Sequence, residues 1–180
     1  MQTNIELKAY CKNKDKIREI LLSIGAIYKN IDSQTDTYFH SKSGILKLRE
    51  GANENKLIHY LREDKKGASE SQVNYYSSEP NSGLKVILEK TVGTKCIVKK
   101  TREIYSIGNV NFHIDTVKYL GDFIEIEAEN KNGSISKEKL QEQCNLYIKT
   151  LEINAKDLVS ESYSDILQQN NLFSQILVDE

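Results

Sequence analysis

Residues 122–129 read Asp-Phe-Ile-Glu-Ile-Glu-Ala-Glu, and this octapeptide decides the fold. Because successive side chains of a β-strand point to opposite faces, the alternation predicts a strand with one acidic face and one apolar face. The acidic face carries Glu125, Glu127 and Glu129, and the apolar face carries Ile124, Ile126 and Ala128. Like charges this close repel on a sheet surface. The strand therefore requires compensating charge from elsewhere in the chain.

Four other predicted strands carry charged residues two positions apart. The members of each face are Asn4, Glu6 and Lys8 within 3–11, Lys47 and Arg49 within 44–50, Tyr60, Arg62 and Asp64 within 56–64, and Lys100 and Arg102 within 95–107. Each face alone is explained by the wet side of a half-buried sheet. Taken together with residues 122–129, the charged side chains are sorted by strand: two strands carry acidic residues and three carry basic residues. This sorting favours charged faces that look at one another across a barrel interior.

Such an interior has a definite chemistry. Carboxylates supply the oxygen ligands of divalent cations, whereas Arg and Lys hold phosphate oxygens. The outer face of the barrel would then be apolar and covered by helices. The pattern predicts one polyanionic, metal-bound ligand, and the wet-sheet interpretation predicts none.

The rest of the chain indicates a single α+β domain spanning residues 1–180. Further strands are predicted at 34–40, 73–78 and 110–117, and short turns such as Gly108-Asn109 favour antiparallel pairing. Helices are predicted after Asn13, at 82–90, from Ser136 and at about 155–168. Residues 65–72 are predicted to form a loop, and the tail from 170 to 180 has no clear pattern.

Composition excludes several classes of protein. The chain has 180 residues, 25 basic and 26 acidic, with a net charge of −1, which argues against a nucleic-acid surface. There is no apolar run of the ~20 residues that a membrane helix needs, and the first residues lack the pattern of a signal peptide. The three cysteines are widely spaced, so we expect reduced thiols in a cytoplasmic protein without nucleic-acid or membrane partners.

Several segments in order resemble one known family. They are Asn4-Ile5-Glu6-Leu7-Lys8, Asp36-Thr37-Tyr38-Phe39, Leu46-Lys47-Leu48-Arg49-Glu50, Tyr60-Leu61-Arg62, 98–105, 113–117, 120–127 and 162–167. Their order and spacing resemble the CYTH family, which contains class IV adenylate cyclases, thiamine triphosphatases and inorganic triphosphatases. The first segment is similar to the Glu-x-Glu-x-Lys signature that opens CYTH domains.

The resemblance implies an eight-stranded closed antiparallel β-barrel with flanking helices, called a triphosphate tunnel, and a requirement for Mg²⁺ or Mn²⁺. Carried over by position, the implied metal ligands are Glu6, Glu125, Glu127 and Asp115. The implied phosphate contacts are Lys8, Lys47, Arg49, Arg62, Lys100 and Arg102. Glu6, Lys8 and Glu127 are the implied catalytic residues.

Asn4 departs from the signature, which has Glu at this position. An amide oxygen can bind a hard cation but brings no charge, so we expect one metal to bind more weakly. The resemblance favours a class IV adenylate cyclase, which converts ATP to cyclic AMP and pyrophosphate. A triphosphatase acting on inorganic or thiamine triphosphate, and a module that binds triphosphate without turnover, are the alternatives. The sequence is compatible with a monomer or a homodimer.

Overall fold

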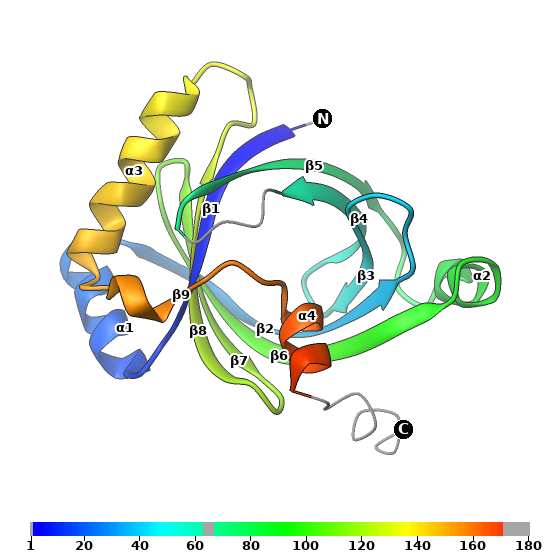
Figure 1. Cartoon of the computed structure of the whole chain (residues 1–180). Helices are drawn as coiled ribbons and strands as arrows, with labels where there is room; N and C mark the ends of the chain where they lie inside the picture. Colours follow the sequence, from blue (N-terminus) through cyan, green and yellow to red (C-terminus); the bar gives the residue numbers. More distant parts are fainter. Residues whose placement is uncertain (1, 63–66, 171–180) are drawn as a thin grey trace.

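A computed structural model describes residues 2–62 and 67–170, apart from the side chains of Gln2 and Arg62. Its main element is an antiparallel sheet in which the strands follow the order β5-β4-β3-β2-β6-β7-β8-β1, and pairing of β5 with β1 closes it into an eight-stranded barrel (Figure 1). The strands are β1 (Gln2–Tyr10), β2 (Ile27–Phe39), β3 (Ile45–Gly51), β4 (Asn55–Arg62), β5 (Ser69–Ser77), β6 (Thr94–Ile107), β7 (Val110–Val117) and β8 (Gly121–Glu129).

Four α-helices flank this barrel: α1 (Lys14–Ser23), α2 (Leu84–Thr91), α3 (Lys137–Thr150) and α4 (Tyr163–Gln169). Three of them begin at a side-chain cap, because the side chains of Asn13, Ser136 and Ser162 each accept a hydrogen bond from the first turn. In α4 the carboxylate of Asp165 also reaches back to the cap residue, which completes a capping box. Local sequence therefore fixes where these helices begin.

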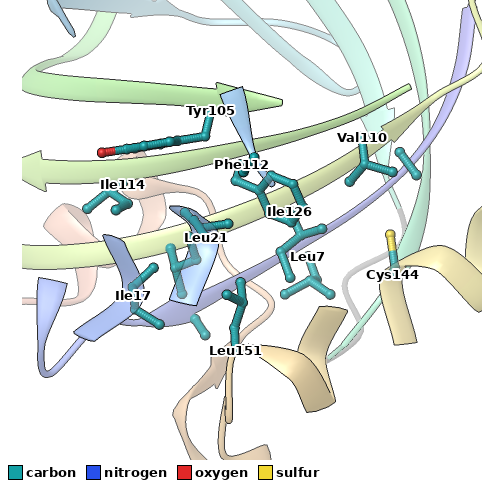
Figure 2. Close-up of a cluster of buried hydrophobic side chains, with 14 of the residues drawn as sticks. Leu7, Ile17, Leu21, Tyr105, Val110, Phe112, Ile114, Ile126, Cys144 and Leu151 are labelled. Carbon is teal, nitrogen blue, oxygen red and sulfur yellow. The ribbon is translucent and has the colours of Figure 1, made fainter. Parts of the chain in front are cut away.

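The main hydrophobic core lies outside the barrel, between its wall and the helices α1 and α3. Apolar residues of β1, β7 and β8 alternate with the charged ones and point outward, where they meet Leu21 of α1 and Leu140 of α3. Figure 2 shows this cluster, with Leu7, Phe112 and Ile126 from the barrel wall. The usual arrangement of a sheet around a core is thus inverted, and the barrel interior is left for polar side chains.

The helix α4 closes one end of the barrel. Its residues Tyr163, Ile166 and Leu167 pack in a second buried cluster with Phe123 and Val98 of the barrel wall. The rings of Phe123 and Tyr163 are 4.9 Å apart. Just before α4, a 3₁₀ turn (Ala155–Asp157) and the short strand β9 (Leu158–Val159) attach the chain to β1. Figure 1 shows α4 at this barrel end, next to β6.

The predicted closed antiparallel barrel with flanking helices is confirmed, with three local corrections. β2 starts at Ile27 instead of residue 34, and β5 starts at Ser69, inside the predicted loop. The predicted helix at 155–168 is wrong in its first half, because Leu158 and Val159 pair with β1 and the helix begins only after Ser162. Residues 63–64 of the predicted fourth strand lie outside the described residues.

No helix among the described residues has the length and apolar character needed to span a bilayer. Cys11, Cys96 and Cys144 are all buried free thiols.

Candidate functional site

Five cationic side chains gather on the inner face of the barrel. Each is less than a tenth exposed, and together they come from the three strands β1, β3 and β6: Lys8, Lys47, Arg49, Lys100 and Arg102. The register explains their meeting, because residues opposite one another on paired antiparallel strands share a face. Arg49 stands opposite Asp36, and Arg102 stands opposite Asp115. The inner face therefore brings together five of the six predicted phosphate-binding residues.

Asp36 is the first carboxylate that holds these cations. It is fully buried on β2, and its two oxygens accept hydrogen bonds from Nε and Nη2 of Arg49 at 2.7 and 2.8 Å. Lys47 donates to it at 2.8 Å, and the Nζ of Lys100 lies 3.9 Å away. Burial alone would raise the pKa of Asp36, but these three cations hold it well below its usual range.

A second group of contacts surrounds Arg102. Its Nε and Nη2 bind both oxygens of the fully buried Asp115 at 2.7 and 2.5 Å, and Nη2 also contacts Glu125 at 2.5 Å. Burial opposes ionisation of Asp115, yet Arg102 and Lys100 lower its pKa. The hydroxyl of Tyr163 donates to the same carboxylate at 2.9 Å. The oxygens of Asp115 are thus directed at cations and at α4.

Lys8 lies on the other side of Tyr163. Its Nζ is 3.9 Å from the centre of the Tyr163 ring and 3.6 Å from a Glu125 oxygen, and it donates to the Glu161 carbonyl at 3.3 Å. The Nδ1 of His113 is 3.6 Å from Glu125 as well. Burial and the nearby Arg102 lower the pKa of His113, which favours the neutral imidazole.

The electrostatics favour an anion at this site. Burial and the neighbouring Arg102 lower the pKa of Lys100 to about 7, and burial also lowers the pKa of Lys47. A lysine whose charged form is disfavoured in this way gains free energy when an anion arrives. Two buried polar atoms on the inner face, Oε1 of Gln34 and Oγ of Ser71, have no hydrogen-bond partner among the described residues. The Ser71 hydroxyl can donate a hydrogen bond to a negatively charged guest, whereas the Gln34 oxygen can only accept one.

Glu6 and Glu127 form a separate carboxylate pair on the same inner face. They are opposite one another on β1 and β8, and the Asn4 side chain donates to Oε1 of Glu127 at 2.7 Å. Burial, and next the charges of Glu6 and Glu129, raise the pKa of Glu127 to about 7. A divalent cation would relieve this repulsion, so the two carboxylates and the Asn4 amide oxygen fit a hard, partly hydrated metal ion.

The fit is incomplete in one respect. Within residues 2–62 and 67–170, no three His, Cys, Asp or Glu side chains are grouped so that they could hold a metal ion as they stand. Of the four predicted metal ligands, Glu6 and Glu127 lie together. Glu125 and Asp115 instead contact Arg102. The metal roles of all four stay predictions.

Several inner residues were not assigned a role from the sequence. Asp36, His113 and Tyr163 occur in the sequence analysis only within segments that resemble the CYTH family. Asp36 can be identified as an inner residue from its position opposite Arg49, but that position is known only once the register of β2 and β3 is known. The side chain of Arg62, the sixth predicted phosphate contact, lies outside the described residues, although its backbone pairs with Ser71 at the end of β4.

Comparisons with known proteins agree with this architecture. Residues 2–163 match the model of the CYTH domain family. A curated relative from Methanocaldococcus jannaschii, named "Putative adenylate cyclase MJ0240", is 25% identical over 173 residues, covering 90% of this chain and 97% of the relative.

Solved structures support the fold. The PH1012 protein of Pyrococcus horikoshii superimposes with a TM-score of 0.77 at 23% identity, covering 92% of this chain and 98% of that one. HpAC1 from Hippeastrum, an adenylyl cyclase homologue described as having a dominant triphosphatase activity, has a TM-score of 0.66 at 15% identity, covering 94% and 96%. At these identities the likeness concerns the fold alone.

Proposed function

This chain belongs to the CYTH domain family, and we propose from that premise that it is a metal-dependent enzyme acting on a triphosphate substrate held inside its barrel. The observation that carries the proposal is the convergence of five buried Lys and Arg side chains on one inner face. A protein that needed these cations only for stability would gain as much from apolar residues, because burying ion pairs gives little net stability.

The inner residues have distinct tasks in this proposal. Arg49 and Arg102 present planar forks that match phosphate oxygens, whereas Lys8, Lys47 and Lys100 act as point charges. Asp36 and Asp115 orient the two arginines through two hydrogen bonds each, so the forks are held in place before the substrate arrives. Phosphoryl transfer depends mainly on such positioning and charge neutralisation.

Glu6 and Glu127, with the Asn4 amide oxygen, would hold Mg²⁺ or Mn²⁺. When bound, the metal supplies charge neutralisation at the reacting phosphoryl group. Burial, and next the charges of Glu6 and Glu129, raise the pKa of Glu127 to about 7 in the metal-free protein, so binding of the metal would release a proton near neutral pH. The same metal site would serve either of two reactions.

Two reactions fit this arrangement. In the cyclase reaction, the ribose 3′-hydroxyl of ATP attacks the α-phosphorus and pyrophosphate leaves; the sequence resemblance and the name of the Methanocaldococcus relative favour it. In the hydrolase reaction, water attacks the terminal phosphorus and orthophosphate leaves; the activity described for the Hippeastrum protein favours it. Both use the same cations, so the phosphate site is common to the two.

A product assay tests the proposal. The purified chain is incubated with Mg²⁺ or Mn²⁺ and, separately, with ATP, inorganic triphosphate and thiamine triphosphate. Cyclic AMP with pyrophosphate would establish the cyclase, and orthophosphate would establish the triphosphatase. If all three substrates remain intact while inorganic triphosphate still raises the melting temperature, the chain is a binding module. If triphosphate also leaves the melting temperature unchanged, the proposed site is wrong.

A further inference from the structure

The barrel end opposite α4, which we call the mouth, carries an exposed tyrosine. β8 defines the two ends, because it begins near Phe123, which contacts Tyr163 of α4, and finishes at Glu129. Asn4 on β1 stands opposite Glu129, and Gln2 on β1 stands opposite Val73 on β5. Tyr75 is two residues beyond Val73 and therefore lies at the mouth, near the end of β8.

The side chain of Tyr75 belongs to the inner face. Tyr75 on β5 stands opposite Ile58 on β4, and Ile58 stands opposite Lys47 on β3. Since Lys47 donates to the buried Asp36, this ladder faces the barrel interior. Tyr76, the next residue, takes the outer face. The two tyrosines are 55% and 68% exposed, so they form a matched pair of accessible rings on opposite faces of one strand.

A chain of charged contacts joins Tyr75 to the phosphate-binding cations. The Nζ of Lys56 lies 5.3 Å from the centre of the Tyr75 ring and 2.7 Å from Glu54. Glu54 in turn bonds to Nη1 of Arg49 at 2.9 Å. Burial would raise the pKa of Glu54, but Arg49 and Lys56 lower it to about 2, so this link is ionised at neutral pH. The Tyr75 ring thus lies beside Lys56, which Glu54 connects to Arg49.

The inner wall of β4 and β5 carries apolar and aromatic side chains beside Lys56, and unlike the apolar inner residues under α4 these side chains are not buried. Its inward positions include Ile58, Tyr60, Val73 and Tyr75, which offer apolar and aromatic surface. These four are also more exposed than the buried cations of β3 and β6. An inorganic triphosphate would use none of this surface. A substrate with a planar ring attached to its phosphates would use it, because aromatic side chains stack on such rings.

We propose that Tyr75 and Ile58 form a subsite at the mouth for the planar ring of an organic triphosphate, such as a nucleoside triphosphate. This inference rests on the proposed function, since the phosphates must occupy the inner cations for the ring to reach the mouth. The triphosphate enters first, and the ring remains against the β4–β5 wall. Tyr75 is then a specificity-determining residue that distinguishes organic from inorganic triphosphates.

Equilibrium binding of ATP and of inorganic triphosphate, in buffer with EDTA so that no turnover occurs, tests this subsite. Tyr75→Ala is expected to raise the Kd for ATP roughly tenfold and to change the Kd for inorganic triphosphate by less than about twofold. Tyr75→Phe, which keeps the ring, should bind both ligands as the unchanged protein does. Tyr76→Ala is the matched control on the outer face and should alter neither Kd. Thermal melts of each variant report folding.

The outcomes separate the two proposals. Failure of the unchanged protein to bind inorganic triphosphate both in EDTA and with Mg²⁺ would overturn the proposed function itself. Normal binding of inorganic triphosphate, with ATP binding equally tight in the Tyr75→Ala and unchanged proteins, would overturn the subsite alone. The subsite would also be wrong if Tyr75→Ala weakened both ligands equally, or if Tyr76→Ala reproduced its effect, because both results indicate a structural role.

Discussion

Arg49 donates hydrogen bonds to both carboxylate oxygens of Asp36, from Nε at 2.7 Å and from Nη2 at 2.8 Å. Both residues are buried, and they stand opposite one another on β3 and β2. The same carboxylate accepts a hydrogen bond from Lys47 and lies near Lys100. One anion therefore orients three cations that are proposed to bind phosphate. Its removal should affect folding and ligand binding in opposite directions.

Asp36→Asn leaves these buried cations without their shared anion. Loss of one partner of a buried ion pair costs about 3–5 kcal/mol of folding free energy, so the variant should melt well below the unchanged protein. Inorganic triphosphate should then raise its melting temperature by more than it raises that of the unchanged protein, because the ligand supplies the missing negative charge. Thermal melts with and without ligand measure both effects. An equal ligand-induced shift in the two proteins would contradict the role of Asp36.

Glu127→Gln should abolish turnover while triphosphate binding persists. It should also alter stability with pH. The folded-state pKa of about 7 lies above the ordinary value of 4.5, so the folded form holds the proton more tightly, and the stability of the unchanged protein falls as pH rises from 4.5 to 7. Glutamine does not titrate. In EDTA, the variant should therefore gain about 1–3 kcal/mol relative to the unchanged protein at pH 8 and little at pH 4.

Urea unfolding at the two pH values measures that difference. A constant difference between pH 4 and pH 8 would mean that Glu127 is not strained in the folded protein. Full activity of Glu127→Gln with Mg²⁺ or Mn²⁺ would remove it from the proposed metal site.

Asn4→Glu restores the acidic residue of the CYTH signature. It replaces the amide that now donates to Glu127 with a further carboxylate, so the metal-free protein should lose stability at pH 8. Mn²⁺ affinity should rise by roughly tenfold, since added ligand charge strengthens binding of hard cations. Mn²⁺ titration followed by electron paramagnetic resonance checks this expectation. Asn4→Gln, which keeps an amide, is the control, and equal Mn²⁺ affinity in the two variants would contradict the assignment.

Triphosphate affinity should decline above neutral pH because of Lys100. Its pKa is lowered to about 7 in the free protein, chiefly by burial and then by Arg102. A bound anion favours the charged lysine and raises that pKa, so binding takes up a proton, and the Kd should increase above pH 7 by up to about tenfold per pH unit. Lys100→Arg stays charged throughout and should flatten the profile. Identical profiles in both proteins would assign the pH dependence to the ligand.

The sorting of charged residues by strand favoured a barrel with a charged interior, and the resemblance to the CYTH family implied its eight strands and its closure. Glu125 and Glu127 are two apart on a strand whose other face is apolar, and Lys100 and Arg102 are likewise two apart on β6. This pattern specified which face would be inside before the register was known. Such information is local, because the direction of each side chain follows from its position along the strand.

The parts that could not be predicted depend on contacts between distant segments. Leu158 and Val159 match a helical pattern, yet pairing with Lys8 and Ala9 of β1 makes them a strand. Tyr163 is one tyrosine among ten until α4 carries it to Asp115. Asp36 is recognised as part of the site only because Arg49 on the neighbouring strand donates hydrogen bonds to it. In each case the deciding partner is specified by tertiary structure.

Because α4 packs into one end of the barrel, the two ends are not equivalent for a ligand. Phe123 and Tyr163 pack against each other at that end, so under the proposed function the substrate would enter and the products would leave through the mouth. The product formed deeper in the barrel would then leave after the one nearer the mouth. A long polyphosphate would likewise be shortened from its ends.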